Sequence, residues 1–429
     1  MIETMAEVEQ VGYGACDSIT GGSAAGSSGA FDDPATWQVI ALSHWPCTDT
    51  KGVNATLTLL DRNAVFADLH YVHLNDPPAV RRARSVIAPT RVVLVNGYKA
   101  MIHPNGVSLL KRAAALGCRL VLYWHETDWA LERMAHDFPI GARRFHVVLQ
   151  RFPKACVTHW SAGAPVSYAL QRRFHVTPAR LRQVFNVIDV DALQPMGPRH
   201  PQRACLTLGA AGRTVPLKGI AFMAGLSESF RELAGREVEI HWIGGGEPPG
   251  LPPHRLVFEG FRTDFAERLR ALDALVVPSF HEAFSLVGAE ALALDKPVFC
   301  RWPVGLAAFL PEAFVFASRG ELEAKLDAYF RAPAAYPAGF FRSIAESFTV
   351  DAFARRAAQA VDPVPDTPPP ATTLALRLRG LGRDLLAQVP SMALRLSPYS
   401  RRVGGCAGLV EWWSSARSRK PSGPDWPTH

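Results

Sequence analysis

The sequence is informative first through what it lacks. No stretch of its 429 residues reaches the roughly 18 uninterrupted apolar residues that a membrane-spanning helix needs. The N-terminus, MIETMAEVEQ, is acidic and does not show the basic-then-apolar layout of a secretory signal. The seven cysteines are scattered singly without a C-x-x-C pair, which indicates neither a disulfide framework nor a zinc site. We therefore expect a protein of the reducing cytoplasm.

The common nucleotide- and metal-binding signatures are missing as well. The run Gly244 to Gly246 follows a strand-like segment, but neither the G-x-G-x-x-G fingerprint nor a P-loop is present. No carboxylate cluster suggests a divalent metal, and the one D-x-D, Asp189 and Asp191, lies in a Pro-rich hinge. No metal site is expected.

Positive charge, in contrast, is concentrated in one part of the chain. The net charge is +7, and between Arg81 and Arg182 there are 17 Lys or Arg against 4 Asp or Glu. Such a block favours an anionic partner: a phospholipid surface, a lipid-linked diphosphate or a nucleic acid. A generic basic surface explains it equally well. Nucleic acid is not expected, because interleaved surface aromatics and a known motif are absent.

Apolar segments and helical patterns alternate twice along the chain. WQVIALSH, TRVVLVNG and CRLVLYWHE read as strands of a first half, with helical patterns such as NGVSLLKRAAALG between them. After a Pro-rich break at residues 186–203 the alternation restarts, and GIAFMAGLSESFRELAG is expected to be one helix. Asn54 is the expected N-cap of a helix in the first half. The pattern predicts two Rossmann-like α/β domains with parallel sheets and a ligand cleft between them.

The segment PSFHEAFSLVGAEALALDKPV places two carboxylates, Glu282 and Glu290, between a buried strand and a helix that begins near Ser285. A helix N-terminus favours an anion, and acids beside it suit the hydroxyls of a sugar bonded to a phosphate. One exposed loop acid and one helix-surface acid would be the plain alternative. In GAAGRTVPLKG, Arg213 and Lys218 offer cations for the same anion, or are simply solvated surface charges.

Taken together, these segments resemble the nucleotide-sugar-binding domain of the retaining glycosyltransferases of family 4 (glycosyl transferases group 1), which have the GT-B fold. GAAGRTVPLKG resembles the family's G-R-x-x-x-x-K-G loop, HWIGGG its strand and glycine turn, and PSFHEAFSLVGAEALALDKPV its E-x7-E block. RLVFEGF, the hinge VFNVIDVDAL and the closing helix FTVDAFARR also match in order. The resemblance covers roughly residues 180–360.

The resemblance implies a role for each matching residue. Glu290 would bind the ribose hydroxyls, Glu282 would lie at the transferred sugar as the catalytic candidate, and Arg213 and Lys218 would neutralise the departing diphosphate. The distal phosphate would lie at the start of the helix after Ser285. The family usually has glycine at positions 283 and 285, where this chain has Ala and Ser. The residues expected to bind the nucleotide sugar are Glu290, the backbone of Phe284 and Ser285, Gly212, Gly244 and Gly52.

The first domain matches more faintly. The loop after WQVIALSH holds only Gly52 where the family has a glycine-rich loop. His125 lies at a strand end where the family often carries a His near the reacting sugar carbon, although a hydrogen-bonded structural histidine fits as well. Glu126 and Asp128 either bind acceptor hydroxyls or cap a helix.

We therefore expect a retaining, metal-independent hexosyltransferase that transfers sugar from a nucleoside-diphosphate donor to a saccharide or lipid-linked acceptor, in cell-envelope or capsular polysaccharide synthesis. It would need no cofactor and would be cytoplasmic, with an anionic membrane surface as a candidate partner. The alternative is a non-catalytic GT-B-like protein that binds a saccharide or a partner. The expected parts are a disordered segment 1–35, an acceptor domain 36–195, a donor domain 196–349, a crossing helix 350–362, and a Pro-rich linker with a basic amphipathic tail 363–429.

Overall fold

The computed structural model describes residues 36–46, 53–195, 205–246, 250–251 and 254–358. Gly52, the N-terminal segment 1–35 and the tail 363–429 lie outside these residues. The described part contains no helix of the length and apolarity that crossing a bilayer requires.

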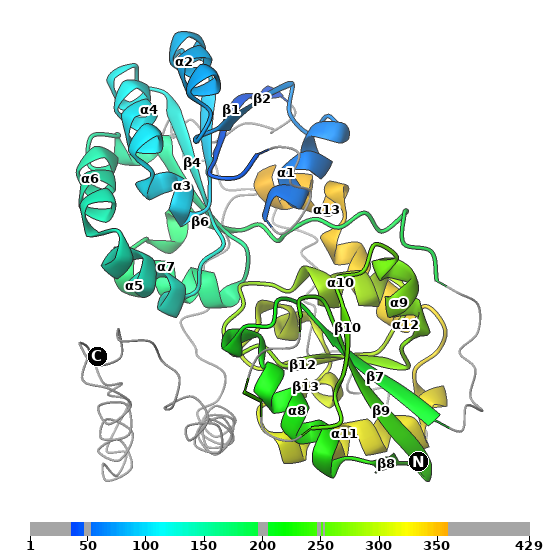
Figure 1. Cartoon of the computed structure of the whole chain (residues 1–429). Helices are drawn as coiled ribbons and strands as arrows, with labels where there is room; N and C mark the ends of the chain where they lie inside the picture. The colour runs from blue at the N-terminus through cyan, green and yellow to red at the C-terminus, as the bar shows by residue number, and fades with distance from the viewer. Residues whose placement is uncertain (1–35, 47–52, 196–204, 247–249, 252–253, 359–429) are drawn as a thin grey trace, which may run out of the picture. The chain divides into compact units, whose positions relative to one another are not determined.

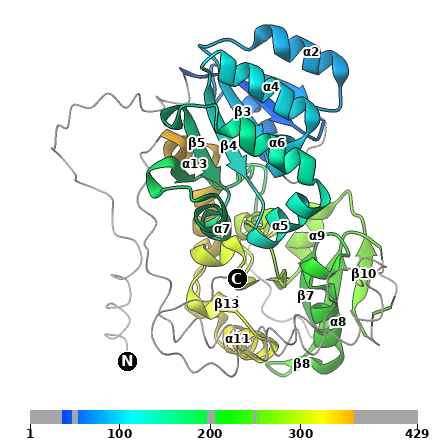
Figure 2. The same ribbon diagram turned by 90° about the vertical axis from the view of Figure 1, so that its left-hand side faces the viewer.

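A six-stranded sheet organises the first half of the chain (Figure 1). All its neighbouring strands pair in parallel, in the order β2-β1-β3-β4-β5-β6. One face packs under α2, α4, α6 and α7, and the other under α1 (Figure 1, Figure 2). Burial on both faces accounts for continuous apolar runs such as Val92 to Val95. The elements are β1 (Gln38–Ser43), α1 (Val53–Arg62), β2 (Asp68–His73), α2 (Pro77–Val86), β3 (Val92–Asn96), α3 (Tyr98–Ile102), α4 (Pro104–Ala115), β4 (Arg119–Trp124), α5 (Asp128–Asp137), α6 (Pro139–Leu149), β5 (Val157–Ser161), α7 (Ala164–Phe174) and β6 (Leu181–Gln183).

A second sheet, in the order β10-β9-β7-β11-β12-β13, organises the second half. Its strands are parallel except for β8, which pairs antiparallel with the first residues of β9. The predicted pair of parallel α/β domains is thus confirmed. The elements are β7 (Cys205–Ala211), the short 3-10 helix η5 (Pro216–Lys218), α8 (Ile220–Ser229), β8 (Glu232–Leu233), β9 (Arg236–Ile243), β10 (Val257–Gly260), α9 (Phe265–Ala271), β11 (Ala274–Val277), α10 (Leu286–Ala293), β12 (Val298–Arg301), β13 (Val315–Phe316), α11 (Arg319–Arg331), α12 (Phe340–Ala345) and α13 (Val350–Ala358).

The last described helix, α13, packs against the first sheet rather than the second. Phe353 is buried in the core formed with Trp160 and Tyr123, at ring-centroid distances of 5.5 and 6.3 Å. Arg182 Nη1 donates to the carbonyl of Ala357 at 2.6 Å. This helix therefore adds to the hydrophobic cover of the first sheet.

Two local predictions were wrong. The helix expected over residues 219–235 ends at Ser229, since the backbone of Phe230 leaves the helical region with a φ of −106° and a ψ of 85°. The rest of the segment forms β8 and a turn in which Ala234 and Gly235 have positive φ angles of 50° and 76°. Asn54 is not an N-cap, since α1 begins at Val53 and the Asn54 side chain turns to Ser43 instead.

Candidate functional site

The two glutamates of the E-x7-E block lie beyond the carboxyl end of β11. The helix α10 begins at Leu286, as expected, and Ser285 is its N-cap, with its Oγ accepting a hydrogen bond from Gly288 N at 3.3 Å. No described residue accepts a hydrogen bond from the N–H groups of Leu286 and Val287, so the start of α10 keeps free donors for an anion. Ser285 has a φ of 100°, in the region that favours glycine, so its backbone is strained.

Lys218 and Glu282 form an ion pair, with Lys218 Nζ 2.7 Å from Glu282 Oε1 and side-chain exposures of 24% and 18%. Two backbone contacts bring their loops together. Phe280 N donates to Leu217 O at 2.9 Å. Gly219 has a φ of 80°, and a Cβ there would lie 2.4 Å from the carbonyl of Pro278. Only glycine permits this approach, so the sequence Lys-Gly fixes Lys218 beside Glu282.

Glu290 lies in the second turn of α10 and is half-buried. Burial raises the pKa of its carboxyl to about 7. None of the residues that the structure describes forms a hydrogen bond with this carboxylate. A desolvated carboxylate with unused acceptors suits a ligand that brings its own hydroxyl donors.

Three glycines bring the carboxyl ends of β7, β9 and β10 into contact. Gly244 has a φ of 106°, and a Cβ there would lie 2.9 Å from the carbonyl of Gly212. Gly244 N donates to Gly260 O at 2.8 Å. The predicted glycine turn is therefore a close crossing of three strand ends, and it leaves the backbone accessible to a ligand.

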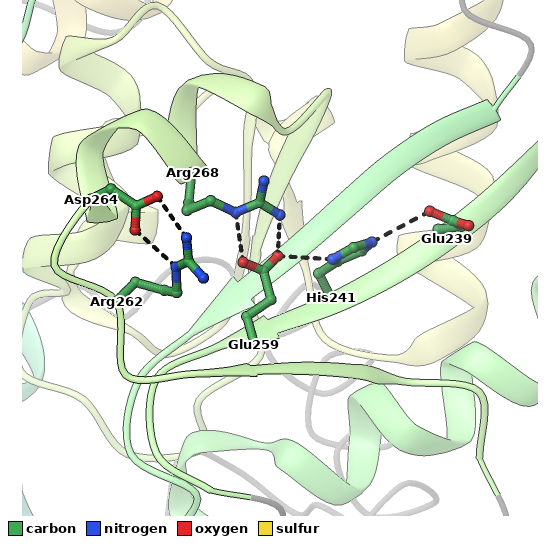
Figure 3. Close-up of polar contacts among 6 residues, drawn as sticks. All are labelled: Glu239, His241, Glu259, Arg262, Asp264 and Arg268. Atoms are coloured by element: carbon green, nitrogen blue, oxygen red, sulfur yellow. Dashed lines mark hydrogen bonds and ion pairs between the residues drawn. The ribbon is translucent and has the colours of Figure 1, made fainter.

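A polar cluster holds the edge strand β10 against β9 (Figure 3). Glu259 of β10 accepts from Arg268 Nε of α9 at 2.6 Å, and its Oε1 lies 2.8 Å from Nδ1 of His241 on β9. The hydrogen bonds from Arg268 are the main reason that the pKa of Glu259 is lowered. Gly260, the next residue after Glu259, accepts the hydrogen bond from Gly244 N. By holding Glu259, the cluster therefore fixes the strand end that contacts the glycine turn.

Arg213 is exposed and has no ion-pair partner in the described ranges. The Phe284 side chain is buried in the core, 4.7 Å from Phe348 by ring centroids, so only its backbone is open to a ligand role. Of the two predicted cations, Lys218 forms an ion pair with Glu282. Arg213 forms no hydrogen bond or ion pair with either glutamate in the described structure, and its role in ligand binding stays a prediction.

The first sheet presents a hydrogen-bonded row of side chains along its carboxyl edge. Ser43 Oγ donates to Asn54 Oδ1 at 3.0 Å, and Asn96 Nδ2 donates to the same oxygen at 3.1 Å. Asn96 Oδ1 then accepts from His125 Nε2 at 2.9 Å. His125 therefore carries its proton on Nε2, and its Nδ1 is buried without a partner in the described structure. Burial lowers the pKa of His125 to about 3, so the ring is neutral.

Sequence reasoning found His125 but missed Asn54 and Asn96. A signal was present, because Ser43 and Asn96 are the last residues of β1 and β3 and His125 immediately follows β4. Parallel strands end at one edge of a sheet, so polar residues that end successive strands come together.

Glu126 caps a helix, which was one of its two expected roles, but the helix is remote in sequence. Its Oε1 accepts from Tyr98 N, the first residue of α3, at 2.7 Å, and its Oε2 accepts from His125 N at 3.0 Å. Burial raises the pKa of Glu126 to about 7.

Asp128 begins α5 and forms an ion pair with Arg173. Across the described ranges, no three His, Cys, Asp or Glu side chains gather in a way that could hold a metal.

Comparison with known proteins agrees with this architecture. Residues 205–321 match the family model of the glycosyl transferases group 1. The structure of Anabaena Alr3699/HepE in complex with UDP and glucose matches with a TM-score of 0.56 at 15% identity, over 75% of this chain and 98% of that one. The sucrose-phosphate synthase tll1590 from Thermosynechococcus elongatus matches with a TM-score of 0.51 at 16% identity, over 82% and 99%. No curated protein matches the sequence.

These matches define the fold as GT-B, as the sequence predicted. The similarity to glycosyl transferases group 1 is confirmed for the matched segment, which contains Arg213, Lys218, Glu282 and Glu290. Membership of family 4 and a retaining reaction stay predictions.

Proposed function

We propose that the protein is a glycosyltransferase that moves a sugar from a nucleoside-diphosphate donor to a hydroxyl of a saccharide or lipid-linked acceptor. The observation that carries this proposal is the Lys218–Glu282 pair at 2.7 Å, next to the open start of α10 and the unsatisfied carboxylate of Glu290. The family-model match over the same residues supports it. So do the UDP and UDP-glucose complexes of the similar Anabaena protein.

Each group has a chemical task in this proposal. As the glycosidic bond breaks, the departing diphosphate gains negative charge, which Lys218, Arg213 and the N–H groups at the start of α10 stabilise. Because these groups supply the positive charge, we propose that no divalent metal is needed. Glu290 accepts the ribose hydroxyls. Glu282, held by Lys218, lies at the transferred sugar, where a carboxylate stabilises a developing positive charge on the ring.

In the first domain, the neutral His125 supports hydroxyl recognition. Its buried Nδ1 can only accept a hydrogen bond, because Nε2 already donates to Asn96. A hydroxyl of the transferred sugar satisfies this nitrogen. Hexosyl transfer with retention, as in family 4, is the form of the reaction we propose, with an acceptor from cell-envelope or capsular polysaccharide synthesis.

The first domain also supports peripheral binding to an anionic membrane. Phe138, Ile140 and Val147 are exposed to 50%, 67% and 48% on and beside α6. Exposed apolar side chains bordered by cations fit the interface of an anionic bilayer. The basic residues around them are Lys111, Arg143, Arg144 and Arg151. Sedimentation with vesicles should show binding that requires anionic lipid and weakens in Ile140→Glu; equal binding to neutral vesicles would contradict the proposal.

The experiment that tests the proposed function is a thermal-shift panel with UDP, GDP, ADP and CMP. A nucleotide at about 100 times its Kd should stabilise the folded protein by about 2.7 kcal/mol. Glu290→Ala should abolish the shift, whereas Glu267→Ala, an exposed acid on α9, should keep it. If no nucleotide shifts the wild type with or without candidate saccharides, the non-catalytic saccharide-binding alternative replaces the enzyme.

A further inference from the structure

A second group of side chains lies at the carboxyl ends of β2, β1 and β3, separate from the donor residues. His44 immediately follows β1, and His73 ends β2 beside it, with Ser43 and His73 paired in register. Lys99 and His103 lie on α3 and at its end, directly after β3. The strand order reverses between β1 and β3, and crevices outside such a point bind ligands in open parallel sheets.

An aromatic face and an ammonium group are presented together here. Trp45 is 44% exposed, and Lys99 Nζ lies 4.9 Å from its ring centroid. The His44 ring meets Trp45 edge-on at 5.1 Å and lies 5.6 Å from the His103 ring. An exposed tryptophan with a cation over it offers an apolar surface and a charge to one ligand.

Hydrogen bonds fix this arrangement. Asn105 N donates to His103 Nδ1 at 3.2 Å, so Nε2 of neutral His103 carries the proton and donates to Asn75 Oδ1 at 3.1 Å. Asn75 Nδ2 in turn donates to the carbonyl of His44 at 3.2 Å. Tyr71 Oη donates to the carbonyl of Trp45 at 2.7 Å. His103 and Asn75 are therefore positioning residues that hold His44 and Trp45.

The cluster has positive charge without a compensating carboxylate among the described residues. Among the described residues Lys99 forms no ion pair, and its ammonium group lies over the Trp45 ring. Burial and the neighbouring Lys99, His103 and His73 lower the pKa of His44 to about 4, and no acidic group opposes them. Nδ1 of His44 is buried without a partner in the described structure. A bound anion would relieve this one-sided charge.

We propose that this cluster is an acceptor subsite for a saccharide that carries an anionic group, a carboxylate or a phosphate. Lys99 binds the anion, the face of Trp45 packs against the sugar ring, and Nδ1 of His44 supplies a further hydrogen-bonding position. The inference rests on the proposed glycosyl transfer and deepens it by naming the charge class of the acceptor.

The test compares three probes that differ in one substituent: glucose, glucuronate and glucose 6-phosphate. Their affinities for the full chain are measured by saturation-transfer NMR. We expect glucuronate, glucose 6-phosphate or both to bind at least about tenfold more tightly than glucose. Lys99→Gln should remove that preference and Lys99→Arg should restore it, whereas Lys154→Gln, an exposed lysine shortly before β5, should leave it intact. Trp45→Ala should weaken all three probes without changing the preference among them.

The outcomes separate the possible sources. Preference for glucuronate alone assigns a carboxylate, and preference for glucose 6-phosphate alone assigns a phosphate. Equal affinity for glucose and both anions, or a preference unchanged in a folded Lys99→Gln variant, overturns the subsite. UDP binding, followed by thermal shift on the same samples, should not change in Lys99→Gln. If the anion preference holds but no nucleotide binds, the subsite stands and the proposed transferase function fails.

Discussion

The carboxyl edges of the two sheets are built from different chemistry. The edge of the second sheet carries opposite charges in contact, Lys218 and Glu282, on loops that glycines bring together. The edge of the first carries a row of neutral hydroxyl, amide and imidazole groups that ends at His125. Charges in contact suit a ligand whose own charge changes during a reaction. Neutral groups with fixed donors and acceptors suit the positioning of hydroxyls.

The largest expected effect comes from removing charge at the second edge. Lys218→Gln should lower the transfer rate about 10²- to 10³-fold, because a preorganised group that stabilises the leaving charge is lost. It should also weaken UDP binding, as measured by calorimetry. Glu282→Gln should lower the rate similarly but leave UDP affinity within about twofold, since we propose that Glu282 contacts the transferred sugar and not the nucleotide. If both variants keep UDP affinity and rate, the ion pair is structural only.

The same contrast explains how much could be predicted from the sequence. Arg213, Lys218, Glu282 and Glu290 could be named as candidates because two continuous segments contain them at characteristic spacing. The end of α8 at Ser229 could not be predicted, because the helical pattern of residues 219–235 runs past Phe230, where the backbone leaves the helix. The row at the first edge draws single residues from separate strands, so its members come together only once the strand order is known.

Asn96→Leu tests the neutral edge. Asn96 is 3% exposed, and the substitution leaves Asn54 and His125 with buried polar atoms that lose a partner. We expect the free energy of unfolding to fall by about 1–3 kcal/mol in chemical denaturation. UDP affinity should not change, because the residues that we propose to bind the donor belong to the other sheet. Asn63→Ala, at an exposed site, should cost less than about 0.5 kcal/mol. A loss of UDP binding in folded Asn96→Leu would contradict the division of tasks between the edges.

Glu290 should make nucleotide affinity depend on pH. With its pKa raised to about 7, the free carboxyl keeps its proton below that pH, whereas ribose hydroxyls bind the ionised form. Binding therefore releases a proton, and UDP affinity should rise as pH increases from about 5.5 to 7 and then level off. The rise is at most about tenfold per pH unit. Stability of the free protein changes in the opposite sense, since the native state binds more protons than the unfolded state in this range and loses stability as pH rises.

Titration calorimetry between pH 5.5 and 8.5 measures this dependence. Glu290→Gln experiences the same titration of the nucleotide phosphate, so the difference between the two proteins isolates Glu290. Parallel pH curves for wild type and Glu290→Gln would show that Glu290 does not change its protonation state on binding.

The smallest effect concerns Ser285, which has a φ of 100°, in the region that favours glycine. Ser285→Gly relieves backbone strain of about 1 kcal/mol or more. It loses the hydrogen bond to Gly288 N, which costs a few tenths of a kcal/mol when glycine replaces an N-cap serine, and it gains entropy in the unfolded chain. These terms nearly cancel, so the net change should be below about 1 kcal/mol. Ser285→Ala keeps the strain and loses the cap, and should be less stable by about 1 kcal/mol. Denaturation should therefore rank glycine at or above serine, and serine above alanine. An alanine variant as stable as the glycine variant would contradict the prediction, because it would show that the backbone at this position is not strained by a side chain.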